Sequence, residues 1–205
     1  MNREEARELI VFMIELREQC ALCVTALSEL EVLVKRPPPD DDEGRRLWNR
    51  RIWIRVHALL SASSNVTHIL WPKPIGIKND RLGKTSIQRG KRLRKFIGIQ
   101  ETNPLVVRKV RNSFEHIDER LDEWLPTTSE DIPLGWAVSA YDPENEPPEG
   151  KSAFRYINVN SMDLRISGET CNLDEVVRWV QSIDDLVPTQ ARMFFHGDRE
   201  LRHNR

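Results

Sequence analysis

Residues 3–35, REEARELIVFMIELREQCALCVTALSELEVLVK, decide the fold because they predict one long amphipathic helix. Apolar side chains recur there at alternating steps of four and three residues, which places them along one side of a helix. They are Leu9, Met13, Leu16, Cys20, Cys23, Leu27, Leu30 and Val34. The three prolines at 37–39 end this helix, and the acidic residues at 40–43 suit the start of the next one.

The remaining residues predict three more helices and a hairpin. The further helices cover residues 45–71, residues 103–125, and residues 173–195 with a break near Pro188. The basic residues 73–100 predict a loop with a short helix. Alternation at period two predicts a β-hairpin at 152–168, and the Pro-rich, acidic residues 126–150 predict an irregular excursion. The sequence therefore predicts one all-α domain over residues 1–205, a four-helix bundle with a β-hairpin inserted before the last helix.

Composition narrows the class of protein. The net charge is −1 with 31% charged residues, so any nucleic-acid site must be a local patch. Three cysteines make no disulfide framework, and no signal peptide or membrane span is recognisable, so we expect a cytoplasmic protein. Cys20 and Cys23 form a C-x-x-C pattern, but both lie in the apolar seam and are expected to be core thiols. We find no glycine-rich phosphate loop and no zinc-protease or hydrolase motif, and expect neither cofactor nor metal.

The stretch RNSFEH at residues 111–116 holds the chemistry-bearing residues. An arginine can hold a phosphate through two parallel hydrogen bonds, and a histidine can exchange a proton near neutral pH. At about 100° per residue, Arg111, Asn112 and His116 fall on one broad polar face of the predicted helix 103–125, away from its apolar stripe. His116 is therefore not expected in the core.

This motif resembles the HEPN superfamily (higher eukaryotes and prokaryotes nucleotide-binding domain). Its hallmark is Arg, then four to six residues, then His, often with a polar residue directly after the Arg. The resemblance implies a dimeric helical bundle that cuts RNA without metal, through attack of the 2′-hydroxyl. It implies that Arg111 holds the phosphate and that His116 acts as general base or acid. Asn112 would orient either the imidazole of His116 or the phosphate. A toxin or phage-defence setting, with an antitoxin protein as partner, is implied by the same analogy.

Basic residues beside the motif and before it are the candidates for holding the RNA backbone, since Lys and Arg neutralise phosphates. They are Arg108, Arg81, Lys84, Arg89, Lys91 and Arg92. A solvated basic loop is the alternative interpretation of the residues between 73 and 95.

Other interpretations of the motif stay open. Arg111 and His116 can belong to a salt-bridged helix surface, because Glu115, Asp118 and Glu119 are near in sequence. Arg51 and His57 satisfy the looser spacing on the second predicted helix. The chain can also be a non-catalytic helical dimer that binds nucleic acid, a nucleotide or a partner protein.

Overall fold

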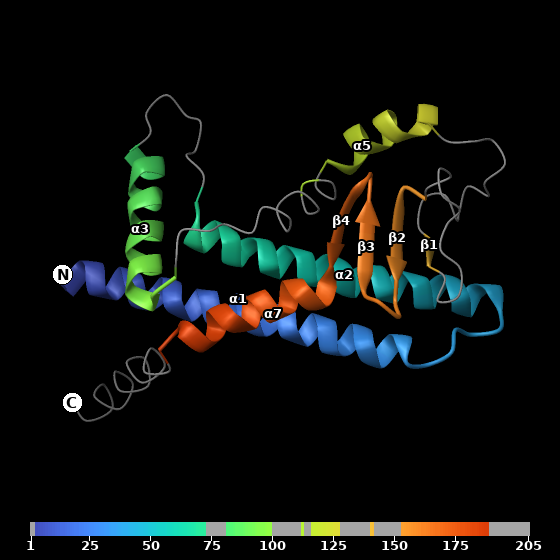
Figure 1. Cartoon of the computed structure of the whole chain (residues 1–205), viewed down its shortest axis with the longest axis horizontal. Coiled ribbons are helices and arrows are strands. Elements are labelled where there is room, and N and C mark those ends of the chain that lie inside the picture. Colours follow the sequence, from blue (N-terminus) through green and yellow to red (C-terminus); the bar gives the residue numbers. More distant parts are fainter. Residues whose placement is uncertain are drawn as a thin grey trace, which may run out of the picture.

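Two long antiparallel helices form the centre of the computed structural model, which describes residues 3–72, 81–99, 112, 116–127, 140–141 and 153–188. Helix α1 (Arg3–Val34) packs along α2 (Asp42–Leu70), as Figure 1 shows. The predicted seam of α1 is confirmed, since all of its residues from Leu9 to Leu30 are buried. Asp41 caps α2 by accepting a hydrogen bond from the Gly44 backbone N–H at 2.7 Å. No described helix combines the length and the apolar character needed to cross a membrane.

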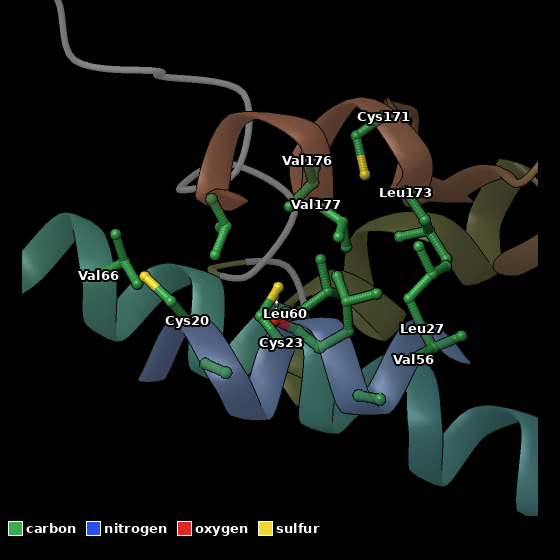
Figure 2. Close-up of a cluster of buried hydrophobic side chains, with 14 of the residues drawn as sticks. Cys20, Cys23, Leu27, Val56, Leu60, Val66, Cys171, Leu173, Val176 and Val177 are labelled. Carbon is green, nitrogen blue, oxygen red and sulfur yellow. Dashed lines mark hydrogen bonds between the residues drawn. The ribbon is translucent and has the colours of Figure 1, made fainter. Parts of the chain in front are cut away.

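Helices α1 and α2 form a helical hairpin, and helix α7 (Leu173–Leu186) packs on the side of it where it contacts both helices. Val176, Val177, Val180 and Ile183 are buried against it, and each contributes about 2 kcal/mol by leaving water. Figure 2 shows Leu173 and Val177 pointing toward the side chains of the hairpin. The predicted start of the last helix at Leu173 is confirmed, and residues beyond 188 lie outside the described chain.

Helix α3 (Arg81–Ile97) packs across the open end of the hairpin, where α1 begins and α2 ends (Figure 1). Only a short helix was predicted here, yet α3 has 17 residues. The buried side chain of Arg94 donates a hydrogen bond to the backbone carbonyl of Leu70, and its guanidinium lies 5.4 Å from the Trp71 ring. The last carbonyls of α2 lack partners within their helix, so this arginine joins the two helices.

A small sheet precedes α7, with strand order β1-β2-β3-β4. The predicted hairpin is confirmed as β2 (Arg155–Asn158) and β3 (Asp163–Ile166), which pair antiparallel. Two strands were not predicted. Strand β4 (Glu169–Asn172) adds to β3 and leads directly into α7, while β1 (Ala140–Tyr141) pairs parallel with β2. The β1 pair falls within the segment expected to be irregular, so that expectation is wrong at these two residues.

The third long helix was predicted as continuous, and it is interrupted. Helix α5 (Ile117–Trp124) begins after His116, whose backbone angles of φ −109° and ψ 45° are not helical, and a 3₁₀ turn (Leu125–Thr127) follows it. No residue of α5 is buried, although the Trp124 ring packs edge-on against the buried Phe154, with ring centroids 5.7 Å apart. The described chain is therefore mostly helical, with a small, mainly antiparallel sheet before the last helix. The predicted helical class is confirmed at this level, and the specific four-helix bundle stays a prediction.

Candidate functional site

Two of the three predicted catalytic residues lie on the surface at the break before α5. Asn112 is exposed in a helical turn, and its carbonyl accepts a hydrogen bond from the His116 backbone N–H at 3.0 Å. The side chain of His116 is 58% exposed. His116 occupies the N-cap position of α5 without making a capping hydrogen bond, so its ring is not used to begin the helix. Arg111 and Arg108 lie outside the described residues.

An acidic side chain stands beside the imidazole. The Nδ1 atom of His116 is 3.7 Å from Oε2 of Glu119, three residues along the chain. This separation allows an ion pair when the ring is protonated, but it is too long for a hydrogen bond. Both groups are exposed, so such a pair adds little to stability.

The outer surface of α5 is acidic around this pair. Asp118, Asp122 and Glu123 are exposed, and the one cation of the helix, Arg120, is bound to Glu123 at 2.7 Å. Acidic residues in the first turn stabilise a helix by facing its positive end. The same charges repel a polyanion, so a nucleic acid would have to approach His116 from the side away from α5.

The predicted RNA-contacting cations divide into two groups. Arg89 and Arg92 face α1: the Arg89 guanidinium lies 3.9 Å from the Phe12 ring centroid, and Arg92 forms an ion pair with Glu8. Burial lowers the pKa of Arg89. These two arginines hold α3 against α1, and the prediction that they are free to bind RNA is not supported by their contacts. Lys91, the third of these predicted contacts, is exposed.

Two lysines of α3 lie on its exposed side, away from α1. Lys91 and Lys95 are exposed, and neither has an ion-pair partner among the described residues. Phe96 of the same helix is also exposed. Arg81 and Lys84 belong to α3, but their side chains lie outside the described part of the chain.

The structure also has a groove that the sequence did not predict. It has a volume of about 720 Å³ and lies beside the C-terminal half of α1, with Arg51 and Arg55 of α2 along one side. A sequence signal for it exists in hindsight: Val32 is apolar but lies off the buried seam. Arg51 and His57 were the alternative Arg-to-His pair. Arg51 lines this groove. His57 is exposed on a different side of α2, because it lies six residues later in the helix.

Cys20 and Cys23 are core thiols, as predicted from their place in the apolar seam, and Cys171 is buried as well. Cys20, Cys23 and Cys171 are free and buried, and burial raises the pKa of each to about 12. A thiol with so high a pKa is a poor nucleophile and a poor metal ligand at neutral pH. Across the described ranges, no group of three or more His, Cys, Asp or Glu side chains is arranged to hold a metal ion.

Comparison with protein-family models, with curated proteins and with solved structures finds no match for this chain.

Proposed function

We propose that this chain is a metal-independent endoribonuclease of HEPN type, with Arg111, Asn112 and His116 as its reacting groups. The observation that carries the proposal is the placement of Asn112 and His116, which stand on the surface at a helix break. A polar pair that packing does not require is available for a substrate or for a second subunit. The full architecture in this proposal is a HEPN-like four-helix bundle in a cytoplasmic homodimer.

The chemistry needs one cation and two proton-transfer groups. Arg111 would hold the scissile phosphate and stabilise the charge that develops on its oxygens. His116 of one protomer would take the proton of the RNA 2′-hydroxyl, whose oxygen then attacks phosphorus. His116 of the second protomer would give a proton to the departing 5′-oxygen as the phosphorus–oxygen bond breaks. The products are a 2′,3′-cyclic phosphate and a 5′-hydroxyl, and only RNA can react.

Two copies of His116 in one site would divide the roles of general base and general acid between them. The setting we propose is a toxin or phage-defence effector, held inactive by an antitoxin protein.

A second candidate function is a non-catalytic helical dimer that binds nucleic acid, a nucleotide or a protein. The acidic surface of α5 favours it, because the helix that begins directly after His116 carries four exposed carboxylates, which repel a phosphate. The engagement of Arg89 and Arg92 with α1 favours it too, since they are two of the predicted phosphate contacts.

Cleavage of RNA in the presence of EDTA separates the two functions. We expect the purified protein to cut single-stranded RNA and leave 2′,3′-cyclic phosphate ends. Arg111→Ala and His116→Ala should each lose at least about 100-fold in rate, the usual contribution of a general acid or base. His57→Ala is the matched control, because His57 is an exposed histidine on α2. Binding without cleavage between pH 5 and 9 would favour the second function.

A further inference from the structure

Helix α1 carries a second apolar stripe on its exposed side. Val11, Leu22 and Val32 are 46%, 55% and 56% exposed, although each is a large apolar residue in a helix whose core seam is elsewhere. They belong to positions 11, 15, 18, 22, 25, 29 and 32, which alternate in steps of four and three along the helix, with polar residues at the positions between them. Ala21 and Thr25, beside Leu22, are exposed and small enough to let another helix approach closely. The three large apolar side chains are therefore available for contact with a partner.

The C-terminal half of this stripe is a basic groove. Val24, Val32 and Leu33 form its apolar floor, and Arg36 and Arg51 stand at its edge. Arg55 is bound to Glu29 at 2.7 Å, whereas neither Arg36 nor Arg51 has an ion-pair partner within the described chain. The groove therefore fits a ligand that is apolar along its centre and acidic at its margin.

The N-terminal half of the same stripe has those properties. Glu15 and Glu18 are exposed between Val11 and Leu22, and Glu18 has no ion-pair partner among the described residues. Within the described chain, the one partner of Glu15 is Gln19 of its own helix, which donates a hydrogen bond to it at 2.8 Å. One half of the surface is acidic and the other basic, with Leu22 between them.

We propose that this face of α1 joins two copies of the chain in an antiparallel, two-fold arrangement about Leu22. Val11 and Val32 lie eleven and ten residues from Leu22, so a second copy turned end to end brings Val11 against the Val32 of its partner. The charges meet in the same register. Trp48 bonds to the carbonyl of Leu33 and Arg55 to Glu29, which places Arg51 level with residues 29–33 of α1. Under the two-fold rotation those residues face positions 15 to 11. Glu29, which is neutralised by its ion pair with Arg55, then lies opposite Glu15, and Arg51 lies opposite residue 13, about 3 Å along the helix axis from Glu15 of the other copy.

The size of this surface suits a stable dimer. Residues 11–34 span about 36 Å of helix, and α1 with the adjoining exposed side of α2 is about 20 Å wide, giving roughly 700 Å² on each copy. Specific interfaces bury about that area per partner. Leu47 and Ile54, which are also exposed, add apolar area on α2 next to Arg51.

This contact is distinct from the subunit contact of the proposed ribonuclease site. Figure 1 shows α5 at the sheet, separated from α1 by the rest of the helical layer. Two copies joined through α1 do not bring their His116 side chains together. The inference therefore stands whether or not the chain cuts RNA, and a composite site would require an additional contact near α5.

Light scattering after size-exclusion chromatography tests the contact, with wild type run at micromolar concentrations. Leu22→Glu should halve the molar mass of the assembly while leaving the circular dichroism spectrum unchanged, because Leu22 is not part of the core. Leu186→Glu is the matched control, since Leu186 is 46% exposed on α7 and should leave the mass unaltered.

Charge exchange then tests the antiparallel register. Glu15→Arg and Arg51→Glu should each lower the mass, and the double variant should restore it, because the pair is re-formed with its signs reversed. A monomeric wild type, or a mass that Leu22→Glu does not change, would overturn the proposal and leave the groove to an acidic partner of another kind. Failure of the double variant to recover also counts against it. RNA cleavage by the same samples is scored separately, so loss of the ribonuclease proposal would leave this result intact.

Discussion

Single side chains at the junction of sheet and helix carry several structural tasks at once. Asn172 ends β4 and caps α7, with its side-chain oxygen accepting the Glu175 backbone N–H at 3.1 Å. Its amide nitrogen donates to the Ser161 carbonyl and to the Asp163 carboxylate, at 2.8 and 2.9 Å. One residue therefore connects the β2–β3 turn to the start of the last helix.

Replacement of Asn172 should weaken the fold measurably. We expect Asn172→Ala to lower the free energy of unfolding by about 1–2 kcal/mol, because the cap of α7 and the link to the turn are both lost. Urea denaturation followed by circular dichroism measures this. Thr170→Ala, an exposed change on the same strand, should stay within about 0.5 kcal/mol of wild type. Equal losses in the two variants would show that the cap contributes nothing.

Asp163 should make stability depend on pH in the acidic range. Hydrogen bonds from the Ser161 and Asn172 side chains lower the pKa of its carboxyl below the ordinary value. A carboxyl with a lower pKa in the folded state stabilises the fold above its ordinary pKa, and this contribution is lost as pH falls through the folded-state value. Stability should therefore decline on acidification, and less steeply in Asp163→Asn. An NMR titration in which Asn172→Ala leaves the pKa of Asp163 unchanged would contradict this cause.

At the scale of elements, α3 depends on close backbone approach to the end of α2. Gly90 is buried in the middle of α3, where a Cβ atom would lie 2.6 Å from Pro72 Cδ and 2.8 Å from the Leu70 carbonyl oxygen. Neither atom can move without shifting the backbone or the proline ring. The glycine is there because the two elements meet at that point.

Gly90→Ala therefore reverses the usual effect of this substitution. In an open helix the change stabilises by about 1 kcal/mol, but here we expect a loss of about 1–3 kcal/mol from overpacking. Thermal unfolding would give the sign directly. Gln88→Ala, on the exposed side of α3, should be neutral or mildly stabilising. A rise in the midpoint temperature with Gly90→Ala would mean that α3 does not pack as described.

The elements differ in how far the sequence predicts them. The α1 seam and the start of α7 follow from local periodicity and capping, so they were predicted correctly. Strand β4 has no alternating pattern in Glu169–Asn172 and exists because β3 offers an edge beside it. The break at His116 has no proline or glycine to mark it.

The candidate site was predicted less completely for the same physical reason. Arg89 and Arg92 look like free cations in sequence, but their partners Phe12 and Glu8 are supplied by α1, far along the chain. Helical phasing predicted that Asn112 and His116 are exposed, and they are, although the continuous helix that it assumed is broken at His116. The groove between Val32 and Arg51 requires two helices and could not be read from either alone.

At the scale of the whole molecule, the three thiols lie inside one continuous core. Figure 2 shows Cys20 and Cys23 of α1 among the side chains of α2, with Cys171 of β4 above them. The Cys23 thiol donates weakly to the Leu59 carbonyl at 3.8 Å. Access to any of these sulfurs requires the helical layers to separate.

Thiol reactivity should therefore report global opening. With burial raising the pKa of all three thiols to about 12, the native protein should react with a disulfide reagent at pH 8 only as fast as it unfolds. The rate should rise with added urea, and all three cysteines should react at once in full denaturant. A single thiol that reacts rapidly in native buffer would place that cysteine outside the core.

The pairing of α1 with α7 has a consequence for synthesis on the ribosome. Arg17 donates a hydrogen bond to the carbonyl of Val187, 170 residues further along, and forms an ion pair with Asp184. Helix α1 therefore gains these contacts only after α7 has been synthesised. The α1–α2 hairpin can form early, but the face that α7 covers stays open until residues 173–187 leave the exit tunnel. A nascent or prematurely terminated chain is thereby marked by an uncovered apolar face, which chaperones and proteases recognise. The core of this protein is therefore completed only after α7 has been synthesised and released.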